Sequence, residues 1–410
     1  MPGKRRWAVV AGALVLVTSA CASLFGFEEL EVASADAGVP DTSRPAPSAE
    51  TGPPSPTTCA TARHRPKVPT TGNTVEAERF TIAIERLDVG ITPETGPPAV
   101  VGYDLDDYCT ESPASSSCLA TTTEDDFKRH VVDKGEGVDN AALALLQLLG
   151  LVYKDFAPSA IEANMRRGKF GFLIDVQGYN GEATDPSVGL AFRPTLGTLD
   201  ARVPMFDGTD AWMLDKEFAN QIEFFGSTLV DQNAYVVDGF LYGSFRELTL
   251  PIQRSAMGNV LRIILKDVIF SAKIARTSDG KNRILFQNGV IAGKWPVADA
   301  IAQVRNFSFD SDESIPLCSQ PEFDKQFRAR VCGARDIQVA FGGDAAAPCD
   351  AISVGFAFSG GQTKAATDHE LRLYRPTYCP TVDCATPPDA GFLDAASISP
   401  LDAGKDGARD

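Results

Sequence analysis

The sequence predicts a mainly β protein, an antiparallel Greek-key-like sandwich or barrel with two or three helices inserted between strands. The densest run of β-branched and aromatic residues, 236–304, is divided by turn residues into consecutive strands and ends in an amphipathic stretch. Upstream of it, short alternating apolar segments are separated by turns rich in glycine and asparagine. Strand and helix do not alternate regularly, which disfavours a parallel α/β sheet.

The N-terminal half of the expected domain mixes strands and helices. Apolar and polar residues alternate over 79–90, which predicts a half-buried strand. The stretch 141–149 is apolar nearly all round, so we expect a buried helix there. A second helix is predicted over 159–167, because a capping-box pattern opens it and Gly168 follows its last turn.

Strand patterns dominate after residue 169. Two alternating segments meet across a predicted turn at 180–186, and a second hairpin is predicted over 203–214 with its turn at Asp207 and Gly208. Within 260–276 the buried parity switches at Lys266 and Asp267, which predicts a β-bulge. A helix is expected to begin at Pro296.

Charge and composition limit the possible partners and divide the chain. The 410 residues carry a formal net charge of −16, whereas nucleic-acid binding needs a basic face, so we expect no nucleic-acid partner. Two segments rich in proline and small residues, 21–73 and 379–410, flank a more apolar region. They predict a disordered linker, a single β-rich globular domain over 74–378, and a low-complexity tail.

The first residues have the features of an export signal. Three basic residues, Lys4 to Arg6, precede an apolar run of 11 residues, Trp7–Val17. A membrane-spanning helix needs roughly 20 apolar residues, so this run is too short to be a stable anchor. We therefore predict a signal peptide over 1–20.

The signal ends in Thr18-Ser19-Ala20-Cys21, which resembles the lipobox of bacterial lipoprotein precursors, with threonine where leucine is preferred. The resemblance implies that Cys21 is diacylated and becomes the first mature residue. It also implies a membrane partner, bound through the N-terminal lipid, and a cell-envelope location in the outer membrane or at the cell surface. Cleavage after Ala20 or Ala22 would instead give a freely secreted protein.

Two further features are similar to uncharacterised lipoproteins of myxobacterial type. They are the FGFEEL motif after the lipobox cysteine and the repeated Asp-Ala-Gly of the linker and tail. That resemblance implies no known activity, and the sequence does not identify a protein or polysaccharide partner.

An even set of cysteines remains once the lipobox cysteine is removed from the nine in the chain. In an exported chain this predicts disulfides. Short spacings predict that Cys109 pairs with Cys118 and that Cys379 pairs with Cys384, while one of three cysteines between 318 and 349 reaches Cys59. The expected disulfide cysteines are Cys59, Cys109, Cys118, Cys318, Cys332, Cys349, Cys379 and Cys384.

Two acidic stretches, 103–109 and 133–140, form the strongest candidate site. Hard cations such as Ca²⁺ take six to eight oxygen ligands, and loops with aspartate, asparagine and glycine supply them. The spacing does not match an EF-hand. The alternative is that the loops are solvated and that the second one only caps the following helix. The predicted ligands of a structural Ca²⁺ are Asp104, Asp106, Asp133, Glu136, Asp139 and Asn140.

The sequence contains no G-x-S-x-G, H-E-x-x-H or G-x-G-x-x-G motif. The leading hypothesis is a lipid-anchored envelope protein with a non-catalytic binding or structural domain, and enzymatic activity stays open. One alternative is an exported hydrolase of envelope or extracellular polymer that uses two carboxylates near strand ends. Its candidates are Asp175, Glu182, Asp185, Asp207 and Asp210.

A second alternative is a carrier that holds an apolar ligand in a β-rich cavity. Three aromatic residues, Tyr179, Trp212 and Trp295, are either core residues or a sugar-stacking surface.

Overall fold

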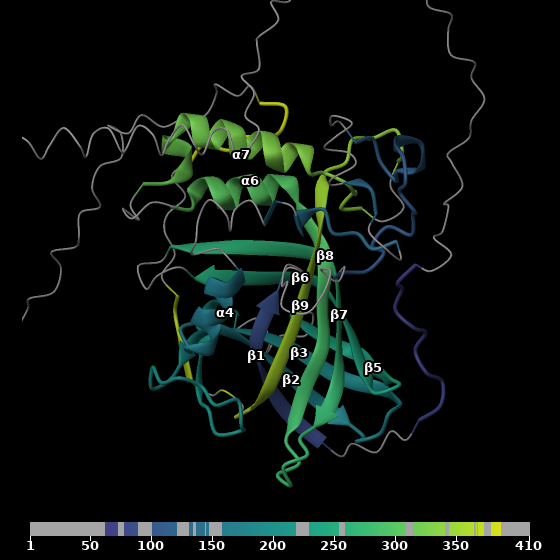
Figure 1. The fold of residues 1–410 in the computed structure, drawn as a ribbon, viewed down its shortest axis with the longest axis vertical. Helices are drawn as coiled ribbons and strands as arrows, with labels where there is room; N and C mark the ends of the chain where they lie inside the picture. Colours follow the sequence, from purple (N-terminus) through teal and green to yellow (C-terminus); the bar gives the residue numbers. More distant parts are fainter. Residues whose placement is uncertain are drawn as a thin grey trace, which may run out of the picture. The chain divides into compact units, whose positions relative to one another are not determined.

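Eight antiparallel strands form a closed barrel (Figure 1). Each strand lies beside its predecessor in sequence, except that β4 (Trp212–Asp215) is bypassed, and the last strand returns to the first. The ring closes where the first half of β3 pairs with β5. The barrel strands are β1 (Glu78–Asp88), β2 (Gly171–Tyr179), β3 (Asp185–Thr198), β5 (Val230–Val237), β6 (Phe240–Gln253), β7 (Val260–Arg276), β8 (Ile284–Pro296) and β9 (Ala351–Thr363).

The prediction of a mainly β, antiparallel fold with inserted helices is confirmed, and the architecture is a barrel. Its strand order is up-and-down, whereas Greek-key-like connections were expected. Short turns join β2 to β3 and link β5, β6, β7 and β8 in succession. The longer connections after β1, β3 and β8 also lead to a neighbouring barrel strand.

The structure is a computed structural model that describes 62–72, 78–88, 101–120, 131–133, 137–143, 145–146, 158–218, 229–253, 259–308, 315–340, 344–364, 366, 368–372 and 379–386. All of these residues belong to one compact unit, Gly52–Asp410. The predicted signal peptide, Cys21, Cys59 and Glu136 lie outside the described residues. No helix within the described ranges is long and apolar enough to span a bilayer.

Phenylalanine side chains fill the barrel interior. The Phe270 ring lies 6.4 Å from that of Phe245, 6.1 Å from Phe286 and 5.2 Å from Phe358, measured between ring centroids. Phe192 extends this network on the opposite wall, 6.4 Å from Phe245. All five are buried, so the described strands enclose packed aromatic side chains.

The β-bulge predicted in β7 is confirmed. The pairing register of β7 with β8 shifts between Lys266 and Ile269. Asp267 has a φ of 49°, a left-handed conformation that an inserted residue adopts at a bulge. The extra residue reverses the parity of the strand, so apolar residues on both sides of it face the core.

The predicted second hairpin over 203–214 is only partly formed. Among these residues only the last three form a strand, as the start of β4, which pairs with the second half of β3 and with the short parallel strand β10 (Asp368–Glu370). The carboxylate of Asp210 accepts hydrogen bonds from the backbone N–H groups of Met205 (3.0 Å) and Phe206 (2.7 Å). These bonds hold the residues before Asp210 in a turn, so they do not form the first strand of the predicted hairpin.

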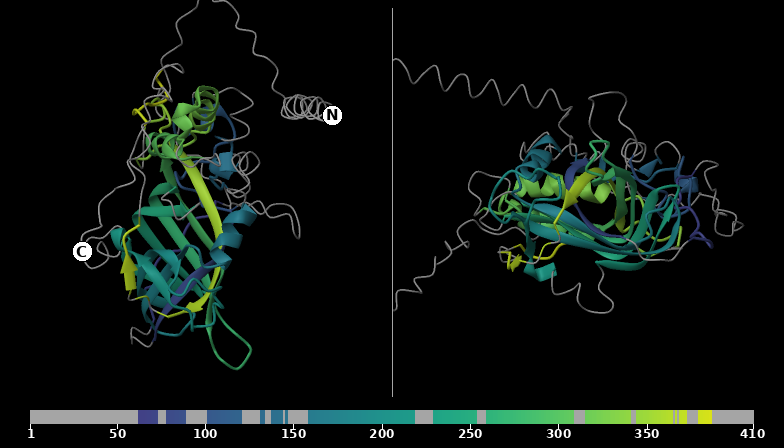
Figure 2. Two further views of the ribbon diagram at one scale, coloured as in Figure 1. Left: turned by 90° about the vertical axis from the view of Figure 1, so that its left-hand side faces the viewer. Right: turned by 90° about the horizontal axis from the view of Figure 1, so that it is seen from below.

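Two helices, α6 (Val297–Asn306) and α7 (Pro321–Gly333), lie across one end of the barrel in both Figure 1 and Figure 2. The start of α6 agrees with the prediction. The sequence did not indicate α7, because its buried face is partly charged. Asp324 of α7 is fully buried and forms an ion pair with Arg305 of α6, with 2.7 Å between Nε and Oδ1.

The helix predicted over 159–167 is α4 (Pro158–Arg166), and Gly168 follows it with a φ of 67°. The helix predicted over 141–149 is only partly described, and Ala141, Ala142 and Leu145 are buried in the main core. Two short 3₁₀ helices complete the described elements, η1 (Pro113–Ser115) and η4 (Leu317–Ser319).

Parts of the predicted linker and tail lie on the domain. Residues 62–72 run beside the barrel, where the Tyr235 hydroxyl donates a 2.5 Å hydrogen bond to the carbonyl oxygen of Pro66. Residues 379–386 are also described, and Val382 belongs to the main core. The folded unit therefore extends beyond 74–378 at both ends.

The predicted disulfide pairing is wrong, although the prediction of disulfides is right. The tail crosses back over α7 and η4, so its cysteines meet those two elements and not each other. Cys109 is also disulfide-bonded, to a partner outside the described residues. None of the three cysteines between 318 and 349 pairs with Cys59, because all three have other partners. The described disulfides are Cys118–Cys349, Cys318–Cys379 and Cys332–Cys384.

Candidate metal centre

The two acidic segments meet against the outer face of β7 and β9. Tyr103 and Asp139 form an antiparallel bridge, in which the Asp139 N–H donates to the Tyr103 carbonyl oxygen at 3.1 Å. The Tyr103 hydroxyl donates to Ser271 of β7 at 2.7 Å. Backbone pairing therefore brings the two acidic segments together.

Asn140 fixes this arrangement to β9 and is not placed as a metal ligand. Its side-chain amide donates to the carbonyl oxygens of Val101 (2.8 Å) and Gly355 (3.2 Å) and accepts from the Gly355 N–H at 3.2 Å. A Cβ atom at Gly355 would collide with the Val101 carbonyl, so only glycine allows this close approach. The Ala141 N–H donates to the Ser353 hydroxyl at 2.8 Å.

Three of the predicted ligands converge. Asp104, Asp106 and Asp139 each offer a carboxylate oxygen, and these three atoms lie within 4.8 Å of one another. Ca²⁺ binds oxygen at about 2.3–2.6 Å, so oxygens on opposite sides of the ion lie about 5 Å apart. One ion between the three carboxylates therefore fits their spacing.

Asp133 borders the same group. Its carboxylate accepts a 2.8 Å hydrogen bond from the Thr110 N–H and lies within hydrogen-bonding reach of Asp139. The remaining predicted ligand, Glu136, is outside the described residues.

Asp336 is a fifth carboxylate that the sequence analysis missed. It follows α7, and its side chain accepts hydrogen bonds from the N–H (2.8 Å) and the hydroxyl of Ser353 in β9. Its charge raises the pKa of Asp139, which places it in the same electrostatic cluster. Nearly 200 residues separate it from the other acidic segments, so no local pattern predicts it.

Burial makes this group costly to ionise. It raises the pKa of Asp104 to about 6 and that of Asp133 to about 7. Burial also raises the pKa of Asp106 and puts those of Asp139 and Asp336 well above the usual range, with further increases from neighbouring carboxylates.

Few positive charges among the described residues oppose these carboxylates. Buried Lys294 of β8 acts to lower the pKa of Asp106, and its ammonium group lies 3.6 Å from Asp267 and 3.3 Å from the Val339 carbonyl. Among the described residues, one lysine and His64 face five carboxylates, so bound protons or a cation would relieve the repulsion within the cluster.

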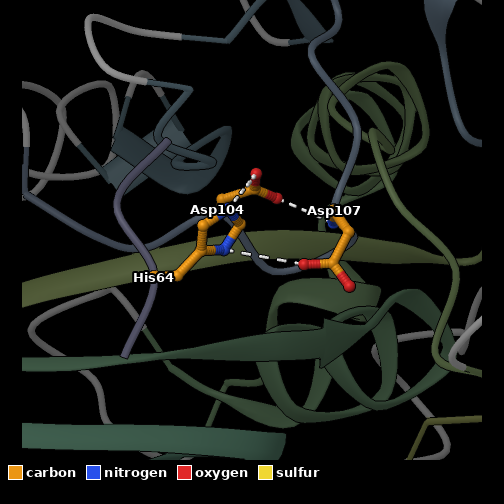
Figure 3. Close-up of side chains that lie close together, drawn as sticks. All are labelled: His64, Asp104 and Asp107. Carbon is orange, nitrogen blue, oxygen red and sulfur yellow. Dashed lines mark hydrogen bonds and ion pairs between the residues drawn. The ribbon is translucent and has the colours of Figure 1, made fainter. Parts of the chain in front are cut away.

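His64, from the predicted linker, lies between Asp104 and Asp107 (Figure 3). Its Nε2 is 3.6 Å from Asp104 Oδ2, and its Nδ1 is 3.6 Å from Asp107 Oδ1. Both distances are too long for hydrogen bonds. Asp104 is 4% exposed, and its Oδ2 atom is buried without a hydrogen-bond partner. Such an oxygen is available to a cation.

Four of the five carboxylates considered for hydrolysis have other partners, and the fifth, Glu182, is exposed. Asp175 is ion-paired with Arg193, and Asp210 holds the turn described above. Asp185 accepts from the backbone N–H groups of Asn180 (2.7 Å) and Ser187 (3.1 Å). Asp207 accepts a 2.5 Å hydrogen bond from the nearby Thr209 hydroxyl.

The three aromatic residues considered for sugar stacking are core residues. Trp212 is 1% exposed, Trp295 is fully buried and Tyr179 is 5% exposed. None of them presents a ring face to solvent.

No protein-family model, no curated protein and no solved structure matches this chain.

Proposed function

We propose that this chain is a lipid-anchored cell-envelope protein with a non-catalytic barrel domain, and that Ca²⁺ at the acidic centre stabilises the domain. The buried Asp104 Oδ2 atom, which lacks a hydrogen bond within a group of convergent carboxylates, carries the cation part of the proposal. A divalent cation would neutralise the repulsion between these groups and complete their coordination.

The ligand set is Asp104, Asp106 and Asp139, with Asp133 able to join it. All are hard oxygen donors, which favours Ca²⁺ over zinc or copper. The ion would tie the segments 101–110 and 131–140 to each other beside β7 and β9. Its role in this proposal is structural, because no group placed to act on a substrate lies among the described ligands.

Anchoring rests on the lipobox-like signal and agrees with the chain's disulfides, which are typical of exported proteins. Membrane fractionation of the wild type and of Cys21→Ser tests it. We expect the wild type in the membrane fraction and the variant either released or left as unprocessed precursor. A soluble wild type whose mature N-terminus is not Cys21 would refute the anchor.

The two alternatives have less support. A hydrolase needs a pair of available carboxylates at a set separation, and four of the five candidates are held in turns or in an ion pair. A carrier needs an apolar cavity, whereas phenylalanine rings occupy the interior of the described barrel strands.

Thermal unfolding in calcium and in EDTA tests the cation. A ligand at a hundredfold excess over its Kd stabilises the native state by about 2.7 kcal/mol, which corresponds to about 5 °C or more in melting temperature. The double variant Asp104→Asn with Asp139→Asn should lose this difference while keeping the shape of both side chains. The exposed Asp200→Asn serves as the matched control. Coinciding wild-type curves in calcium and EDTA would refute the cation.

A further inference from the structure

A polar hollow of about 280 Å³ lies on the outer wall of the barrel, and its lining residues come from β2, β3 and β5. Figure 1 labels these three strands. It is separate from the acidic centre, since none of its lining residues belongs to that cluster. Its polar lining includes Asp175, Gln177, Ser187, Arg193 and Gln232.

The hollow exists because β3 presents small residues to the outside at this point. Gly189 lies directly across from Gln177 in the β2–β3 register. A Cβ atom at Gly189 would be 3.6 Å from the Gln177 Cβ and 3.7 Å from Gln232 Oε1, which are ordinary contacts. Ala191 is the next outward residue of β3. The missing side chain therefore leaves space between two glutamines that belong to different strands.

Several polar groups around this space are available to a ligand. In the part of the chain that the structure describes, the side chains of Gln177, Ser187 and Gln232 form no hydrogen bond, and all three residues are exposed. A carboxylate–guanidinium pair, Asp175 with Arg193, completes the lining. Asp175 is 5% exposed and held by a 2.6 Å hydrogen bond from the Thr81 hydroxyl of β1, so its position is fixed before any ligand arrives.

We propose that this hollow binds a neutral saccharide unit. Asp175 and Arg193 cancel each other's charge, so the lining selects neither an anion nor a cation. Glutamine amides and a serine hydroxyl both donate and accept hydrogen bonds, which matches the dual character of sugar hydroxyls. The small apolar floor, Ala191 and Val230, suits the C–H face of a sugar ring.

Other ligand classes fit this wall less well. An extended peptide usually binds by adding a strand to a free sheet edge, but here both edges of β3 are paired, with β2 and with β5. An apolar ligand would leave the glutamines and the ion pair desolvated without partners. The saccharide proposal does not depend on the anchor or on the cation.

The affinity for a single sugar should be weak. No aromatic ring belongs to the described lining of the hollow, so binding depends on hydrogen bonds that compete with water. A ligand of monosaccharide size should therefore bind with a Kd on the order of 1 mM.

Titration of the ¹⁵N-labelled mature protein with glucose, galactose, mannose and N-acetylglucosamine tests the proposal by NMR. A blocked trialanine peptide and inorganic phosphate are the comparison probes. We expect saturable shifts of β2 and β3 amides with at least one sugar. Gly189→Leu should weaken that binding tenfold or more, because leucine fills the hollow from a position where a Cβ is tolerated.

Two further variants keep the test decisive. Gln287→Leu places the same side chain at an exposed site on β8 and should leave sugar binding unchanged. Gln177→Ala removes one amide without filling space and should weaken binding even if the leucine variant does not fold. The proposal is overturned if no sugar binds at roughly twentyfold the expected Kd, if binding persists in both pocket variants, or if only the peptide or phosphate binds here.

Discussion

Without a divalent cation, the domain should become less stable as the pH rises from 5 to 8. The cause is the raised pKa values in the acidic centre, about 6 for Asp104 and about 7 for Asp133. An unfolded aspartate has a pKa near 3.9, so the folded protein binds more protons than the unfolded chain over this range. The stabilisation that these bound protons provide is complete below about pH 4. It is lost as the pH rises through the pKa values of Asp104 and Asp133 in the folded protein.

The size of the effect follows from the shift at Asp104. A shift of about two pKa units is worth about 3 kcal/mol in full, and roughly half of that falls between pH 5 and 8 because the folded pKa lies inside this window. Asp133 adds to the same slope, although its titration is linked to that of its neighbours. The expected loss in free energy of unfolding is therefore about 2–4 kcal/mol.

Urea denaturation at pH 5, 6, 7 and 8, in EDTA and in calcium, measures this loss directly. Calcium should flatten the slope, because a bound cation favours the ionised carboxylates that protons would otherwise neutralise. Asp104→Asn should reduce the slope in EDTA, while Asp200→Asn should not. Stability in EDTA that is constant or rises between pH 5 and 8 would refute the electrostatic account of the acidic centre.

Three further predictions concern the fold. Phe270→Ala should lower the free energy of unfolding by about 3–5 kcal/mol in a denaturant titration, because the ring contacts several others in the barrel core; a loss under 1 kcal/mol would contradict a filled interior. Replacing both Cys332 and Cys384 with serine should cost about 2–5 kcal/mol, measured in the same way, since the bond closes a separation of 52 residues. Gly355→Ala should expose the segment 101–110 to limited proteolysis, because the new methyl group collides with the Val101 carbonyl. If the variant resists the protease as well as the wild type does, the close packing of Gly355 against Val101 is contradicted.

Local patterns predicted much of the barrel. Alternation fixed which residues of β7 face inward, and the parity switch located its bulge at Asp267, because both features depend only on neighbouring residues. The sequence pattern did not predict helix α7, because its buried face includes the charged residue Asp324. That residue is buried only because it pairs with Arg305 of α6, and a local apolar pattern does not reveal such a contact.

In the candidate site too, local sequence patterns predicted the residues within each loop but not the contacts between distant segments. Asp104, Asp106 and Asp139 were predicted from their own loops and do converge. Asp336 joins them only through tertiary packing against β9, and the disulfide partners likewise depend on where the tail crosses α7. Spacing in the chain carries no information about either contact.

Isothermal titration of calcium into the chelator-treated mature protein at pH 6 tests the central claim most directly. The account predicts saturable uptake of one Ca²⁺ with release of about one proton or more, because Asp104 and Asp133 are partly protonated at that pH. Proton release is obtained by repeating the titration in buffers of different ionisation enthalpy. The double variant Asp104→Asn with Asp139→Asn should show no uptake. Absence of saturable uptake by the wild type, or equal uptake by this variant, would contradict a cation at the acidic centre.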